Sequence, residues 1–260
     1  MACSLQSSPV RALGTMHARL PYVIRVSAIC NSGTFPLCSG CLMKPVCGPA
    51  EGQSPHPSSL LGVHRKVKRG LALYRAGDAC NTIFFVLTGS AKVRLSDEVG
   101  REQILDFPLS GDLFGFDGLE NGIHICDAVA LEDMQVCAIS VKALMLRCRE
   151  HEPTQRMLNR LMMHEFERGQ RLVLVLGRMA SEKRVVWFLL DMSKRMAANG
   201  YSARQFNLRM TREDIAQHLG MTVETVSRTF TKLNDLKVLT VHHRHIEIMD
   251  FSGLQALLAT

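Results

Sequence analysis

The chain has 260 residues, 47% of them hydrophobic, and a formal net charge of +7 at pH 7. That length is enough for two modest domains, no apolar run is long enough to span a bilayer, and no secretory signal is recognisable. We therefore expect a cytoplasmic protein without membrane contacts, whose nine cysteines do not form a disulfide framework. The positive charge permits nucleic-acid binding without establishing it.

The first predicted segment is a loop that carries three cysteines. Residues up to about 55 lack periodic hydrophobicity and are rich in Ser, Pro and Gly. Within them, Cys38, Cys41 and Cys47 follow a C-x2-C-x5-C pattern, which fits an iron–sulfur cluster or zinc. Either centre needs a fourth ligand, for which the candidates are Cys3, Cys30, Cys80, Cys126, Cys137 and Cys148. Spacing alone leaves Cys126 and Cys137 nearly equal.

The middle of the chain has the sequence pattern of a β domain. Short strands are predicted at 82–87, 91–95, 103–107 and 134–139, with turn signals rich in Gly and Asp between them. Many short strands at this spacing predict a double-sheet jelly roll.

A long helix is predicted from about 153 to 179, with Pro153 in its first turn. A spacing of about 3.5 residues places one stripe along it, made of Met162, Phe166, Gly169, Val173 and Leu176. Periodicity alone is equally consistent with a helix packed on its own domain and with the seam of a parallel homodimer. Another helix is expected to begin at Ser181, with that serine as its N-cap.

The last third contains a helix-turn-helix pattern. Thr211 is expected to cap a short helix, Gly220 to make the turn, and Thr222 to cap a second helix. On the second helix, the polar residues predicted to face outward are Glu224, Thr225, Ser227, Arg228 and Thr231.

The outward face of the second helix has the chemistry of base recognition. When such a helix enters the major groove, its amino-terminal residues reach the base edges. Arg228 can donate two hydrogen bonds to guanine, Glu224 can accept one from cytosine, and Ser227 can contact a base or a phosphate. The strands predicted at 238–241 and 246–248 form a wing, whose three histidines we interpret as a solvated tip rather than a metal site.

This order of elements resembles the CRP/FNR superfamily of bacterial regulators over nearly the whole chain after residue 37. The FNR branch, the fumarate and nitrate reduction regulators, is indicated by C-x2-C-x5-C, by F-G-F-D at 114–117, and by T-V-E-T-V-S-R at 222–228. The resemblance implies an α+β fold with a flexible leader (1–37), a cluster-binding loop and β-roll sensor domain (38–152), a dimerisation helix (153–180) and a winged helix-turn-helix DNA-binding domain (181–260).

The resemblance also implies a cofactor and partners. An oxygen-labile 4Fe–4S cluster would be held by Cys38, Cys41, Cys47 and Cys137, because M-Q-V-C-A-I-S at 134–140 matches the strand that carries the family's fourth ligand. The cluster would control homodimerisation and binding to a double-stranded DNA palindrome resembling TTGAT-N4-ATCAA, where the dimer would meet RNA polymerase. The residues expected at the DNA are Glu224, Ser227 and Arg228, with Thr225, Thr211 and Thr222 beside them.

One departure and several alternatives accompany this resemblance. Gly169 stands where the branch often carries an acid, so the metal-free protein would dimerise more readily. A cyclic-nucleotide activator would need an arginine that 120–126 does not supply. Another interpretation is a DNA-binding regulator of the same fold that responds to haem, zinc or a small molecule. A cupin-type metal enzyme is discounted because His124 is the only histidine between Gly70 and Ser140.

Overall fold

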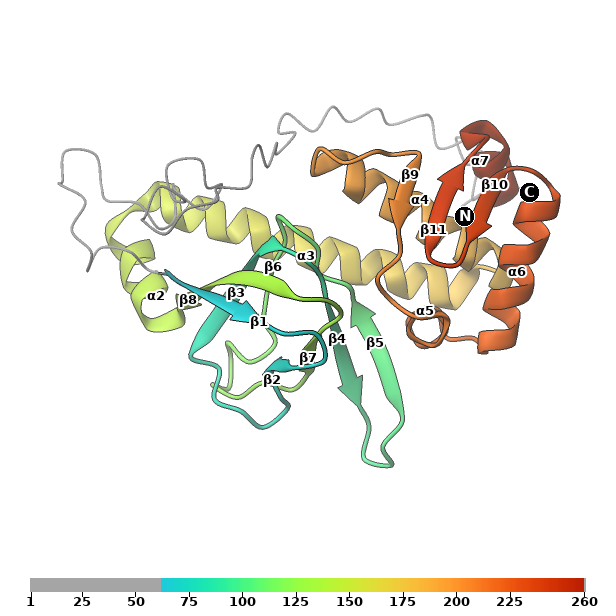
Figure 1. Ribbon diagram of the computed structural model, residues 1–260. Coiled ribbons are helices and arrows are strands. Elements are labelled where there is room, and N and C mark those ends of the chain that lie inside the picture. Colours follow the sequence, from blue (N-terminus) through green and yellow to red (C-terminus); the bar gives the residue numbers. More distant parts are fainter. Residues whose placement is uncertain (1–61, 260) are drawn as a thin grey trace, which may run out of the picture.

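The computed structural model describes residues 62–259, which form a β roll, a long helix and a carboxy-terminal domain (Figure 1). Cys38, Cys41 and Cys47 of the cysteine loop therefore lie outside the described residues, as does the leader at 1–37. The strands of the roll are β1 (Gly62–Val67), β2 (Ala72–Tyr74), β3 (Thr82–Thr88), β4 (Ala91–Ser96), β5 (Glu102–Asp106), β6 (Leu113–Phe114), β7 (Asp127–Ala130) and β8 (Met134–Ser140).

Two antiparallel four-stranded sheets make up the roll, which confirms the predicted jelly roll. The first sheet has the order β1-β8-β3-β6, and the second has the order β2-β7-β4-β5. Apolar side chains from both sheets meet in an inner core, represented by Tyr74, Phe84, Val93 and Val136. Such a sandwich buries one face of each sheet and leaves the other for different contacts.

The outer face of the first sheet is covered by helices. Because side chains alternate along a strand, Val136 and Ala138 of β8 point into the inner core while Cys137 and Ile139 point outward. There they pack against the helices α2 (Val141–Glu150) and α3 (Glu152–Arg178). We call this cluster the helix-side core; its buried members are Ile83, Phe85, Leu113, Cys137, Ile139, Leu144, Cys148 and Leu158.

Helix α3 links the roll to the carboxy-terminal domain and runs behind the roll in Figure 1. The domain contains α4 (Ser181–Ala198), β9 (Gln205–Asn207), α5 (Arg212–Leu219), α6 (Val223–Asp235), β10 (Leu239–His242), β11 (His245–Ile248) and α7 (Phe251–Ala259). Ala180, not Ser181, is the N-cap of α4. The expected serine cap is therefore wrong by one residue, because Ser181 already has helical geometry and makes no capping hydrogen bond.

The helix-turn-helix follows the local signals in the sequence. Thr211 forms a complete capping box with Asp214 at the start of α5, and the Thr222 hydroxyl accepts from the Thr225 N–H at the start of α6. Gly220 ends α5 with φ +58°, a conformation that favours glycine. Strands β10, β11 and β9 form the wing sheet.

No helix among residues 62–259 has the length and apolar character needed to cross a membrane.

Candidate functional site

Helix α6 presents a polar face to solvent and an apolar face to the domain core. Glu224, Ser227 and Arg228 are exposed, while Thr225 is half-buried. On the opposite face, the residues buried in the core are Val226, Phe230 and Leu233. The backbone N–H of Glu224 and the Thr222 hydroxyl lower the pKa of the Glu224 carboxyl, which keeps this acceptor ionised. The predicted base-reading residues thus lie together on one accessible face.

A second basic feature lies where α5 begins and the wing turns. Leu208, Met210 and Thr211 line a pocket of about 180 Å³ together with Arg212, His243 and Arg244. The Arg212 guanidinium stacks 3.5 Å from the centre of the Phe230 ring, and its Nη1 is buried with no hydrogen-bond partner among the described residues. Cations at a helix amino terminus suit a phosphate. The sequence analysis missed Arg212, although its position directly after the Thr211 cap was a usable signal.

The turn at the tip of the wing is short. His242 pairs with His245 across the hairpin, so only His243 and Arg244 form the turn, and His243 has φ +55°. No group of three or more His, Cys, Asp or Glu side chains in the described part of the chain is arranged to hold a metal ion.

Cys126 and Cys137, which spacing could not distinguish, lie in different cores of the roll. Cys126 is 2% exposed and lies in the inner core, where burial and the charge of Asp117 raise the pKa of its thiol to about 12. Cys137 is 7% exposed and lies on the outer face of the first sheet, in the helix-side core. Cys126 lies between the two sheets, whereas Cys137 lies on the outer face of the first sheet beside β1, the first described strand after the cysteine loop in the sequence. Of the two thiols, Cys137 is the one on the strand that pairs with β1.

The two faces of α3 have different surroundings. Leu158, Leu172 and Val175 are buried within the same chain. Of the predicted seam residues, Phe166 is 57% and Val173 is 71% exposed. Gly169 is also exposed, and a Cβ added there would meet nothing within 4 Å. The other two seam residues are partly buried: Met162 packs on the helix-side core, and Leu176 lies against Gly220. The centre of the predicted stripe is thus open, and its ends contact the protein itself.

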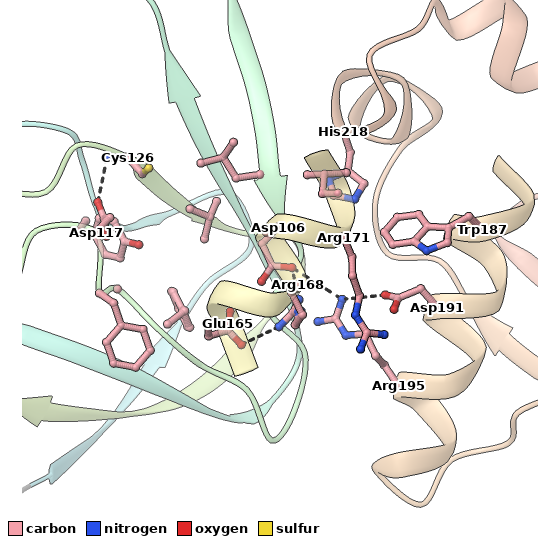
Figure 2. Close-up of a pocket in the computed structure, with 18 residues that line it drawn as sticks. Asp106, Asp117, Cys126, Glu165, Arg168, Arg171, Trp187, Asp191, Arg195 and His218 are labelled. Carbon is pink, nitrogen blue, oxygen red and sulfur yellow. Dashed lines mark hydrogen bonds and ion pairs between the residues drawn. The ribbon is translucent and has the colours of Figure 1, made fainter. Parts of the chain in front are cut away.

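An ionic cluster joins the roll to α3 and α4 where the three meet (Figure 2). On α3, Arg168 bonds Glu165 at 2.9 Å and also contacts Asp106 of β5. On α4, Arg195 donates to Asp112 at 2.6 Å, and Arg168 lies 3.7 Å from the same carboxylate. We call these five residues the interdomain ionic cluster. Four of its members, Asp106, Glu165, Arg168 and Arg195, line a cavity of about 300 Å³ that continues to Tyr74 and Asp117 in the roll. An acid at the roll end of this cavity does not favour a cyclic phosphate.

The roll also contacts the first helix of the helix-turn-helix. Lys92 pairs with Asp214 of α5 at 2.6 Å. The Gln103 side-chain amide donates to the carbonyl oxygens of Gln217 and His218 at 2.7 and 3.0 Å. Three roll residues, Ile104, Phe107 and Leu109, are buried in the same core as the helices of the carboxy-terminal domain. The roll and the helix-turn-helix therefore share a continuous interface.

We expect Asp112→Asn to lower the free energy of unfolding by about 3 kcal/mol, because it removes one of the two carboxylates that Arg168 and Arg195 share, and both arginines are nearly buried. Burial would raise the pKa of the Asp112 carboxyl, but Arg195 and Arg168 outweigh it and lower that pKa, so the carboxylate is charged at neutral pH. Denaturant unfolding measures the effect. The matched control is Asp97→Asn, which breaks an exposed pair with Arg101 and should change the free energy of unfolding much less than Asp112→Asn. Equal losses in the two variants would contradict a structural role for the cluster.

Comparisons with known proteins match both domains of the chain. The Crp-like helix-turn-helix domain matches residues 183–257, and the cyclic nucleotide-binding domain matches residues 64–151. Transcriptional regulatory protein btr of Bordetella pertussis is 36% identical over 85% of this chain and 93% of its own length. Fumarate and nitrate reduction regulatory protein of Salmonella typhimurium is 33% identical over 89% of this chain and 94% of its own length. The structure of FixK2 from Bradyrhizobium japonicum has a TM-score of 0.72 and 28% identity, covering 77% of this chain and 99% of that one.

Proposed function

Because the chain belongs to the CRP/FNR family of bacterial transcriptional regulators, we propose that it is an oxygen-responsive member in which a 4Fe–4S cluster controls DNA binding. It is a DNA-binding regulator and not an enzyme. Relatives named as anaerobic regulatory protein and as fumarate and nitrate reduction regulatory protein support the oxygen response. The observation that carries the proposal is the position of Cys137 on the outer face of the roll.

The proposed ligands are Cys38, Cys41, Cys47 and Cys137. When bound, a 4Fe–4S cluster would supply an oxygen-labile link between these four thiolates. Cys137 contributes a ligand on a rigid central strand, since β8 is paired on both sides, with β1 and with β3. The other three thiolates come from a segment without predicted regular structure, so Cys137 is the fixed member of the set.

Packing contacts among the described residues connect Cys137 to α3, the proposed dimerisation helix. Cys137 packs in the helix-side core together with Leu144 of α2 and Leu158 of α3. The same helix continues through Phe166 and Val173 to the start of the carboxy-terminal domain. A restraint on β8 would therefore bias the position of α3, and the interdomain ionic cluster would pass that bias to α4. A coupling of about 1–3 kcal/mol, which changes affinity about 5–150-fold, is enough for a switch.

The proposed active form is a homodimer on a palindromic operator resembling TTGAT-N4-ATCAA. The exposed apolar side chains of α3, including Phe166 and Val173, support a seam with a second copy. Such a dimer would place its two α6 helices in major grooves about 34–36 Å apart, one helical turn of DNA. Glu224, Ser227 and Arg228 would read base edges, with Thr225, Thr211 and Thr222 beside them. At a promoter this dimer would contact RNA polymerase.

Gly169→Asp is expected to weaken dimerisation of the metal-free protein by about 1 kcal/mol or more, because each new carboxylate would face its copy across the seam. The fold tolerates the change, since the space around Gly169 is open. Sedimentation equilibrium without iron measures the dissociation constant. Gly169→Asn is the control, because it adds a side chain of the same size without charge. If Asp and Asn give the same constant, Gly169 does not lie at a dimer seam.

Iron and sulfide analysis of protein purified without oxygen tests the proposed cofactor. We expect about four irons and four inorganic sulfides per chain, with a straw-brown colour that bleaches in air. Colourless protein containing zinc would instead support a constitutive DNA binder with a structural zinc site. Protein with a haem spectrum and no inorganic sulfide would support a haem-based sensor.

A further inference from the structure

Strand β1 is an edge strand of the first sheet and pairs with β8 (Figure 1). Its first residue, Gly62, lies beside Cys137 of β8. In the register of the two strands, Gly62 faces Ile139 and His64 faces Cys137. A Cβ built on Gly62 would lie 2.3 Å from the Cys137 Sγ, far inside van der Waals contact. The sulfur therefore occupies the space that a side chain at position 62 would fill.

We propose that Gly62 is a positioning residue for Cys137, and that its missing side chain keeps the sulfur turned toward the amino-terminal end of β1. This inference rests on the proposed function, because it concerns the thiolate that would complete the cluster. The backbone at Gly62 is extended and has no positive φ, so glycine is not required there for conformational reasons. The close approach of the Cys137 sulfur is therefore the feature of this position that a side chain would disturb.

The surroundings of Cys137 explain why the direction of the sulfur matters. On the side of β3, Cys137 is paired with Phe85, and both belong to the helix-side core with Leu144 and Leu158. A sulfur pushed away from Gly62 would therefore turn toward apolar side chains, away from any partner thiolate. On the side of β1, the chain continues directly into the segment that carries Cys47. Fourteen residues lie between Cys47 and Gly62 and the segment spans at most about 50 Å when extended, so chain length does not limit their meeting.

The test compares Gly62→Ala with Val63→Ala in the full-length protein. Val63 is the next residue on the same strand and is exposed, so its truncation controls for disturbance of the edge strand. Both variants are reconstituted with iron and sulfide without oxygen, and the cluster absorbance and iron content per chain are measured. We expect Gly62→Ala to bind less than about one third of the iron bound by wild type, whereas Val63→Ala binds the wild-type amount. Equal iron in Gly62→Ala and wild type, or equal loss in both variants, would overturn the inference.

Two further measurements do not depend on the cluster. In metal-free protein, alkylation of Cys137 by iodoacetamide, followed by mass spectrometry, should be slower in Gly62→Ala than in wild type, since the sulfur is displaced into the core. Gly62→Ala should also lower the midpoint of thermal unfolding by about 2–4 °C, and the added change Cys137→Ala should remove that loss because it deletes the contacting sulfur. Unchanged alkylation and no rescue would refute the positioning role.

The outcomes also separate this inference from the proposed function. If wild type binds no iron and no sulfide, the proposed function fails. Slower alkylation of Gly62→Ala, together with rescue by Cys137→Ala, would then still support the positioning of the sulfur by Gly62. If wild type binds the cluster and Gly62→Ala binds it equally well, the proposed function stands and the positioning role fails.

Discussion

Cys137→Ser is expected to abolish cluster binding, whereas Cys126→Ser is expected to leave it at the wild-type level. The two thiols are a matched pair, because both are nearly fully buried in the same roll. Each substitution replaces a nearly buried thiol by a hydroxyl. Their difference therefore isolates the ligand role: Cys137 lies on the outer face of the first sheet, and Cys126 lies between the sheets.

The measurements for this pair are iron content and operator affinity without oxygen. Cys137→Ser should lose the iron and about 5–150-fold in operator affinity, the range of a typical coupling free energy. Cys126→Ser should keep both. Cys41→Ser, in the cysteine loop, should behave like Cys137→Ser. Retention of cluster absorbance by Cys137→Ser, or its loss from Cys126→Ser alone, would show that the fourth ligand is assigned to the wrong side of the roll.

Arg228→Lys should weaken specific DNA binding by about 1–3 kcal/mol, or about 5–150-fold, while non-specific binding changes little. Lysine keeps the charge but lacks the planar fork that bonds O6 and N7 of one guanine at once. Arg228→Ala should lose the same specific contact and also some non-specific affinity. Titration of operator and scrambled duplexes at one salt concentration separates the loss of specific affinity from the loss of non-specific affinity.

The control for Arg228 is Lys232→Ala. Lys232 lies one turn further along α6, and its amine bonds Glu182 at 2.7 Å, so it is engaged within the protein. Its loss should affect both duplexes slightly and equally. An equal loss on both duplexes for Arg228→Lys would place Arg228 on the phosphate backbone instead of a base.

The helix-turn-helix was predictable because its signals are local. The caps at Thr211 and Thr222 and the turn at Gly220 each depend on residues within one helical turn, and the structure confirms all three. Ser181 shows the limit of such signals. A serine before an apolar run is a good cap in general, but the helix here begins one residue earlier than that pattern suggests.

The features that the sequence did not predict depend on strand pairing or on distant residues. Spacing could not decide between Cys126 and Cys137, because only the pleat of β8 determines which face of the sheet receives the thiol. Arg168 and Asp106 are 62 residues apart, and Arg195 and Asp112 are 83 apart, so no local pattern connects them. The periodicity of α3 was ambiguous because the helix has apolar residues on both of its faces, one packed and one open.

The most direct test of the central claim is operator binding by one anaerobic preparation before and after exposure to air. Iron and inorganic sulfide are assayed in both samples, and the oligomeric state is measured in parallel. We expect iron-containing dimer to bind the operator tightly, and air to remove inorganic sulfide, lower the dimer fraction and weaken binding about 5–150-fold. A preparation without iron or sulfide that binds the operator equally well before and after air would contradict the account.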